Sequence, residues 1–181
     1  MRAVLGRHVL VAALGLAGGC KARDAGGLGG PRLEVRWTGA DTAAFGARAT
    51  AEWCDSLNLL EIRAVGGDTG VGLALYPRGG IEPGTYPIRR PEVADTTPPA
   101  AAVALRWFSQ ATVQGFQGDS GEVALRRAPD GALSGRFTAA IRAVSGSGRL
   151  NLTGSFDGLR PRPATRGCST PATSDSAAGV N

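Results

Sequence analysis

The chain has 181 residues, of which 43% are hydrophobic and 19% charged. This length and composition suit a single folded domain and argue against wholesale disorder, although 28 Gly and 11 Pro far exceed average usage. The formal net charge of +5 rests on 19 Arg and one Lys, and His8 is the only histidine, so most histidine and lysine chemistry is excluded at the outset.

Residues 1–20 have the form of a secretory signal peptide followed by a cysteine. Arg2 and Arg7 supply the positive charge at the start, and residues 9–17 form a short apolar segment. That segment is too short to cross a bilayer as a stable helix. We therefore expect export, with residues 1–19 removed from the mature protein.

The small residues Ala17-Gly18-Gly19 before Cys20 resemble the lipobox of bacterial lipoproteins, except that Ala17 stands where that family usually has leucine. The resemblance implies cleavage before Cys20, acylation of that cysteine and a membrane partner held through the lipid. Lys21 rather than Asp follows, which by the sorting rule of enteric bacteria favours the outer membrane, facing the periplasm or the surface. Ordinary signal-peptidase cleavage near residues 17–19, giving a secreted protein, is the alternative.

The residue types that remain after this cleavage exclude several kinds of catalysis. No histidine is left, so Ser–His–Asp and Cys–His mechanisms and histidine-based zinc or copper sites are excluded. Lys21, the only lysine, adjoins the anchor, which removes Schiff-base and P-loop chemistry from the folded domain. We predict a non-enzymatic protein without a metal or other cofactor. The mature chain would carry 18 basic and 15 acidic residues. Because this basic excess is slight, we expect no nucleic-acid partner.

Composition divides the mature chain into three parts. Residues 20–31 are the lipidated cysteine and a tether, with four glycines in the eleven positions 21–31. Residues 32–160 form the expected domain. Residues 161–181 are rich in Pro, Ser, Thr and Ala and are expected to be a disordered tail.

Alternation of apolar and polar residues predicts strands through the first part of the domain. The expected strands are 33–37, 47–53, 57–65, 71–75, 84–88, 103–107 and 112–116, with turns at 39–42 and 66–70 and a loop at 91–99. Pro87 suits an edge strand. Residues 41–45 could form one helical turn at most.

Gly118-Asp119-Ser120-Gly121 looks like the nucleophile motif of chymotrypsin-like proteases. Those enzymes need a histidine to take the proton of the serine, and the mature chain has none. Gly, Asp and Ser all favour turns. We therefore predict a tight turn before a strand that begins at Glu122.

The last third predicts a three-stranded meander with one solvated face. Leu133, Gly135, Phe137, Ala139, Ile141 and Ala143 alternate along one long strand, and Leu150, Leu152, Gly154 and Phe156 along the next. A turn at 128–131 and another at 145–148 separate these strands. Nine or ten short strands in total predict an all-β fold, a single antiparallel β-sandwich or barrel.

The meander resembles small β-rich bacterial envelope lipoproteins of unknown function. The shared feature is a repeated G-x-F in successive strands, here Gly135-Arg136-Phe137 and Gly154-Ser155-Phe156, preceded by Gly84-Thr85-Tyr86. The resemblance covers residues 84–156 loosely. It implies the fold class and a place in the cell envelope, and it supplies no activity.

Cys54 and Cys168 remain as a pair once Cys20 carries lipid. An even number of cysteines in an exported protein favours a disulfide. It would close a loop with a sequence separation of 114 and join the start of the tail to the early strands. Two free thiols are the alternative, and neither cysteine has the C-x-x-C spacing of a redox site.

Basic residues of the meander are the candidate binding surface. They should lie on its solvated face and could meet phosphate or carboxylate groups: Arg126, Arg136, Arg142 and Arg149. The alternative is that a chain with arginine as almost its only cation places some on any solvated sheet. Trp37, Trp53 and Trp107 fall at strand positions, so we expect them in the core rather than in a sugar platform.

Three functions remain open from the sequence. The first is a non-enzymatic envelope lipoprotein that binds or scaffolds an unknown envelope component. The second is a β-barrel carrier of a lipid or other apolar ligand, which requires an enclosed apolar cavity. The third is a carboxylate-dependent glycan hydrolase, which requires two acidic residues about 5–10 Å apart in a cleft.

Overall fold

The computed structural model describes residues 30–90, 97–109, 112–164 and 168, and this part of the chain is all β. It holds ten strands and no helix, as the turn spacing predicts. The strands are β1 (Arg32–Gly39), β2 (Ala43–Cys54), β3 (Leu59–Gly66), β4 (Thr69–Tyr76), β5 (Gly84–Pro87), β6 (Ala100–Ser109), β7 (Thr112–Arg127), β8 (Leu133–Ala143), β9 (Arg149–Leu159) and β10 (Arg162–Pro163). The expected signal peptide, Cys20 and most of the tether lie outside the described residues.

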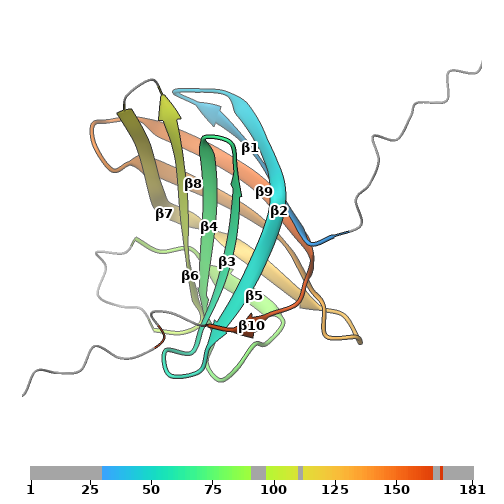
Figure 1. Ribbon diagram of the computed structural model, residues 1–181. Coiled ribbons are helices and arrows are strands. Elements are labelled where there is room, and N and C mark those ends of the chain that lie inside the picture. Colours follow the sequence, from blue (N-terminus) through green and yellow to red (C-terminus); the bar gives the residue numbers. More distant parts are fainter. Residues whose placement is uncertain (1–29, 91–96, 110–111, 165–167, 169–181) are drawn as a thin grey trace, which may run out of the picture.

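Eight of the strands close into an antiparallel barrel (Figure 1). Each pairs with the next in the order β1-β9-β8-β7-β6-β4-β3-β2, and β2 pairs back with β1. The sequence left sandwich and barrel open, and this last pairing makes the fold a barrel. β5 and β10 stand outside the circle: β5 pairs with β7, and β10 runs parallel to β2.

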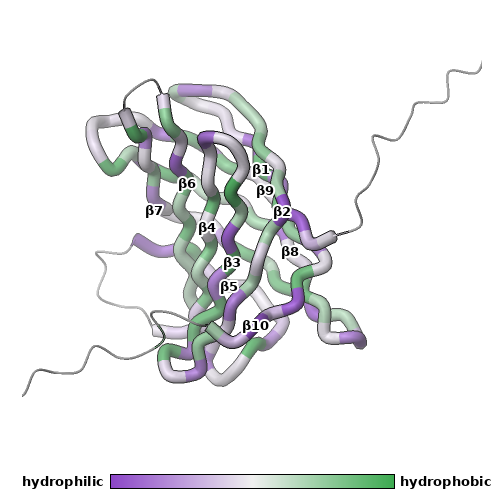
Figure 2. Tube along the Cα trace, viewed as in Figure 1, coloured by the Kyte–Doolittle hydropathy of each residue, from purple (hydrophilic) through white to green (hydrophobic). Residues whose placement is uncertain are grey.

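Strand alternation fills the barrel interior with apolar side chains. In β8, Leu133, Phe137 and Ile141 are at most 2% exposed, while Arg136 between them is exposed. Figure 2 shows hydrophobic and hydrophilic residues alternating along the strands. The largest fully buried side chains are Phe137, Phe156, Leu33, Leu60, Ile62, Leu73, Leu75, Leu105, Leu133, Ile141, Leu150 and Leu152.

The two G-x-F motifs of the meander pack against each other across β8 and β9. Gly135 stands opposite Phe156, and Phe137 stands opposite Gly154. A Cβ atom at either glycine would overlap the aromatic ring opposite it. Each glycine therefore leaves the space that a ring of the neighbouring strand occupies, which gives these Gly–aromatic pairs a physical reason.

Residues 118–121 form a β-bulge, so the tight turn expected there is wrong. β7 runs from Thr112 to Arg127, and its register with β8 shifts between Gly118 and Ser120. Gly121 has a φ of +129°, and a Cβ atom there would overlap the carbonyl oxygen of Thr138. Because β8 pairs with β7 on both sides of the bulge, strand pairing overrides the local turn preference.

The structure also corrects two boundaries. β2 begins at Ala43 and pairs with β1, so the helical turn allowed at 41–45 does not form. The expected tail begins too early at residue 161, because β10 pairs with β2 and Cys168 is bonded to Cys54. These contacts hold the described part of 161–181 against the barrel, and residues 165–167 and 169–181 lie outside the described residues.

The two ends of the barrel differ. The N-terminal end carries residues 30–32, the β2–β3 turn at 55–58 and the β7–β8 turn at 128–132. Stacked rings lie near the opposite end. Trp37 and Trp107 have ring centroids 5.6 Å apart, and Trp107 and Phe116 have centroids 5.0 Å apart.

Candidate functional site

A pocket of about 410 Å³ lies at the N-terminal end of the barrel. It combines an aromatic ring, apolar side chains, guanidinium groups and carboxylates. Its lining comes from the end of β2, the loop before β5, the β7–β8 turn and the chain after β9: Trp53, Asp55, Ile81, Arg127, Asp130, Gly131, Leu133, Arg160, Pro161, Arg162 and Pro163.

Strand register explains why Arg127 belongs to this pocket. Leu125 faces the interior, so Arg126 lies on the outer face and Arg127 returns to the inner face at the last position of β7. There Arg127 pairs with Leu133, the first residue of β8, which is 1% exposed. The inward-facing positions of β7 thus end with the exposed guanidinium group of Arg127, next to the buried side chain of Leu133.

Arg160 is tied to Asp130 across the pocket. Its Nη1 donates to the carbonyl oxygen of Asp130 at 2.8 Å, and its Nη2 donates to Oδ2 at 2.5 Å. The backbone N–H of Ala132 donates to Oδ1 of the same carboxylate at 3.1 Å. The hydrogen bond from Ala132, followed by the charge of Arg160, holds the pKa of Asp130 below its ordinary value. Asp130 is therefore an ionised carboxylate with its acceptors already engaged.

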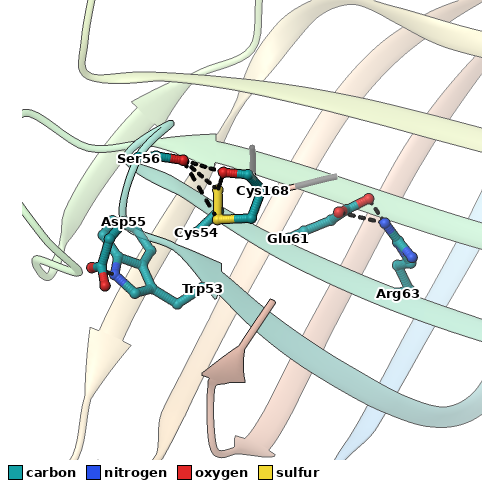
Figure 3. The surroundings of a disulfide bond; sticks show 7 residues. All are labelled: Trp53, Cys54, Asp55, Ser56, Glu61, Arg63 and Cys168. Carbon is teal, nitrogen blue, oxygen red and sulfur yellow. Dashed lines mark hydrogen bonds and ion pairs between the residues drawn. A yellow bond between two sulfur atoms is a disulfide. The ribbon is translucent and has the colours of Figure 1, made fainter. Parts of the chain in front are cut away.

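The second carboxylate of the pocket is also engaged. Nε1 of Trp53 donates a hydrogen bond to Oδ1 of Asp55 (Figure 3). The side chains of Arg127 and Arg162, by contrast, make no hydrogen bond or ion pair with the described residues. Two guanidinium groups without an ion pair therefore line the same pocket as one half-buried indole, and Glu52 stands opposite Arg162 in the register of β2 and β10. This arrangement attracts an anion.

A disulfide and a short strand hold the C-terminal wall of the pocket. Cys54 and Cys168 are joined with their Cα atoms 5.3 Å apart (Figure 3). β10 pairs with Glu52 and Trp53, and the N–H of Ala164 donates to the carbonyl oxygen of Trp53 at 2.9 Å. The residue that supplies the ring, Trp53, thus also anchors the segment that supplies Arg160 and Arg162.

The arginines expected to share one face of the meander all point outward but lie in two places. Arg142 stands opposite Arg149, and Arg136 stands opposite Ser155, six residues along β8 from Arg142. At about 3.3 Å per residue these two groups are roughly 20 Å apart along the strand. Arg126 lies on the outer face opposite Ser134. None of the four lines the pocket at the N-terminal end.

One of the two places contains a carboxylate that pairs with arginines. Asp119, at the bulge, accepts a hydrogen bond from Nε of Arg90 and lies 3.5 Å from Nη1 of Arg149. The hydrogen bond from Arg90, with the charges of Arg90, Arg149 and Arg142, holds the pKa of Asp119 below its ordinary value. This cluster is a surface ion-pair network in which one carboxylate faces three guanidinium groups.

Sequence reasoning missed the residues that the pocket brings together. Arg127 was outside the predicted face because it follows Arg126 at a strand end, where alternation alone does not show which residue points into the mouth of the barrel. Arg160 and Arg162 lay at and beyond the expected domain boundary. Trp53, expected in the core, is half-buried at the pocket. The run Arg160-Pro161-Arg162-Pro163 was the available signal, since alternating prolines suit an extended segment.

The described residues hold no group of three or more His, Cys, Asp or Glu that could bind a metal ion. Within the same residues, no helix has the length and apolar character needed to cross a membrane. No protein-family model, curated protein or solved structure matches the chain. The pocket must therefore be interpreted from its own chemistry.

Proposed function

We propose that this protein is a non-enzymatic binding module of the bacterial cell envelope, held to a membrane by lipid on Cys20. Its pocket at the N-terminal end of the barrel binds an anionic ligand. The observation that carries the proposal is the presence of Arg127 and Arg162, without acid partners among the described residues, beside the indole of Trp53.

The lining favours an amphiphile over a bare anion. A guanidinium group binds a phosphate or carboxylate through paired hydrogen bonds. Trp53, Ile81 and Leu133 give the same pocket an apolar side against which an acyl chain or a ring can pack. The ligand class is therefore a phosphate or carboxylate joined to an apolar group, as in an anionic lipid or a free alkyl phosphate ester.

The location suits a ligand that comes from a membrane. Gly30 and Pro31 line a cleft together with Arg160 and Arg162, so the chain enters the barrel beside the pocket. A linker of eleven residues with the glycine-rich composition expected of a flexible tether would span roughly 17–20 Å. With lipid on Cys20, the tether would keep the pocket close to the headgroups.

The carrier alternative receives less support. Phe137, Phe156 and ten further large apolar side chains fill the interior where an enclosed ligand would have to sit. Eight-stranded barrels have an interior just wide enough for side chains or one small ligand, and here side chains occupy it. The pocket at the mouth of the barrel is the better place for an apolar group.

The hydrolase alternative rests on Asp55 and Asp130, which both line the pocket. A glycosidase needs one carboxyl group with a raised pKa to protonate the leaving oxygen. The pKa of Asp130 is lowered, and Asp55 accepts a hydrogen bond from the indole of Trp53. The lowered pKa makes Asp130 unsuited to the acid role, and both carboxylates are engaged with arginine or tryptophan, so binding is the better interpretation.

Isothermal titration calorimetry with dodecyl phosphate, below its micelle concentration, tests the proposal. Arg127→Gln should weaken binding about tenfold or more, since a hydrogen bond to a charged group contributes about 1.5–3 kcal/mol. Arg126→Gln is the matched control, because the neighbouring side chain lies on the outer face. Equal effects of the two variants would refute the pocket as the binding site.

Three further ligands separate the sources of the anion. Inorganic phosphate should bind more weakly than dodecyl phosphate, because it leaves the apolar side of the pocket unused. Dodecanol should bind more weakly too, because it lacks the charge. Vesicles that contain phosphatidylglycerol should compete with dodecyl phosphate if lipid headgroups reach the pocket, and fail to compete if only free esters do.

A further inference from the structure

Apart from the contact of Arg160 with Asp130, the wall of the pocket formed by residues 160–163 has few contacts of its own to keep it in place. β10 is only two residues long and pairs with a single neighbour, β2. Pro161 and Pro163 have no backbone N–H, so this stretch can donate few hydrogen bonds. Fixing the backbone of one residue costs about as much free energy as one backbone hydrogen bond contributes. The few hydrogen bonds of β10 therefore give little net stability to this segment.

The disulfide adds the constraint that these hydrogen bonds do not supply. Cys54 directly follows Trp53, the residue with which β10 pairs, and it is 4% exposed. Cys168 lies four residues beyond Ala164, and its carbonyl oxygen accepts a hydrogen bond from Oγ of Ser56 (Figure 3). One covalent bond thus fixes the chain beyond β10 to the strand end that carries the ring of the pocket.

We infer that the Cys54–Cys168 disulfide controls ligand binding, so that the pocket is complete only in the oxidised protein. This inference rests on the proposed function of the same site. Reduction by a dithiol converts the disulfide to two cysteine thiols and the dithiol to its cyclic disulfide, and a thiol-oxidising environment reverses the step. In the reduced protein the wall that bears Arg160 and Arg162 detaches from β2, while the barrel itself stays folded.

Binding of dodecyl phosphate to the oxidised protein, to the protein reduced with dithiothreitol and to the Cys54→Ser/Cys168→Ser variant tests the inference. The reduced protein and the variant should bind about tenfold or more weakly, and removal of the reductant with reoxidation should restore the affinity. Far-ultraviolet circular dichroism should keep its strand signal throughout. Unchanged affinity, with two free thiols shown by thiol titration, would overturn the inference.

Hydrogen exchange separates failure of the inference from failure of the proposed function, since it needs no ligand. The amides of Arg160, Arg162 and Ala164 should exchange faster after reduction, while those of β8 and β9 should not change. Unchanged exchange at residues 160–164 would refute the inference alone. Faster exchange without any binding of dodecyl phosphate to the oxidised protein would instead refute the proposed function.

Discussion

Replacing Gly154 with Ala tests the reciprocal packing of the two G-x-F motifs. The added Cβ would overlap Cζ and Cε1 of Phe137 and would lie 2.7 Å from the carbonyl oxygen of Glu34. The ring of Phe137 is 2% exposed, and β1 is paired on both sides, so neither obstacle can move freely. Overpacking of this kind costs about 1–3 kcal/mol of unfolding free energy.

Urea unfolding followed by tryptophan fluorescence, with the disulfide intact, measures this cost. Gly72→Ala is the matched control, because no atom lies within 4 Å of its added Cβ. That variant should range from neutral to about 1 kcal/mol more stable. Surface substitutions usually change the free energy of unfolding by less than about 0.5 kcal/mol. If the unfolding free energies of Gly154→Ala and Gly72→Ala differ by less than that, the packing argument is refuted.

A double variant locates the cause of the destabilisation. Phe137→Leu removes the ring atoms that the new Cβ would meet, and the obstacle at Glu34 remains. The Gly154→Ala/Phe137→Leu protein should therefore be less destabilised than the sum of the two single variants by about 1 kcal/mol or more. Strict additivity would show that the ring and the glycine do not interact.

Three other predictions concern the anchor, the bulge and the ion-pair cluster. Cys20→Ser should abolish acylation and release the protein from membranes or trap its precursor; mature protein that still fractionates with membranes after a high-salt wash, at the wild-type amount, would contradict the anchor. Gly121→Ala should lower the melting temperature in thermal unfolding, because φ is +129° and the Cβ would overlap the carbonyl oxygen of Thr138; an unchanged melting temperature would show that the bulge rearranges. The pKa of Asp119 is held below its ordinary value in the folded protein, so its ion pairs stabilise the fold above the unfolded pKa and lose this effect as the pH falls through the folded pKa. Asp119→Asn should therefore be less stable than wild type in urea at pH 7, and the difference should close in acid; a difference independent of pH would mean that the charge is irrelevant.

The strands of the meander could be predicted because their burial is a local pattern. Residues 133–143 and 150–156 alternate strictly, and each inner position of β8 is apolar. The choice between sandwich and barrel could not be made in this way. It depends on the pairing of β1 with both β2 and β9, and alternation says nothing about which strands become neighbours.

The errors have the same origin. Gly118 to Gly121 carries strong turn preferences, yet β7 continues through it because β8 pairs on both sides. The G-x-F motifs are visible in the sequence. Why glycine and phenylalanine occur together becomes clear only from the register of β8 and β9, which places a glycine opposite each ring.

The pocket was the hardest feature to predict. Arg127 lies within the expected domain and Arg162 beyond its end, and β10 brings the second arginine into the pocket that Trp53 lines. Cys54 and Cys168 were recognised as a pair, but which residues their bond would hold together depends on the parallel pairing of β10 with β2. The arginines are evident in the sequence, but only the tertiary structure brings them together at the N-terminal end of the barrel.

A nuclear magnetic resonance titration of the arginine Nε–Hε groups with dodecyl phosphate tests the binding of an anionic amphiphile most directly. The resonances of Arg127 and Arg162 should shift together and saturate with one affinity, while those of Arg126 and Arg136 on the outer face stay in place. Shifts spread evenly over outer-face arginines, or confined to Arg126 and Arg136, would contradict binding in the pocket at the N-terminal end of the barrel.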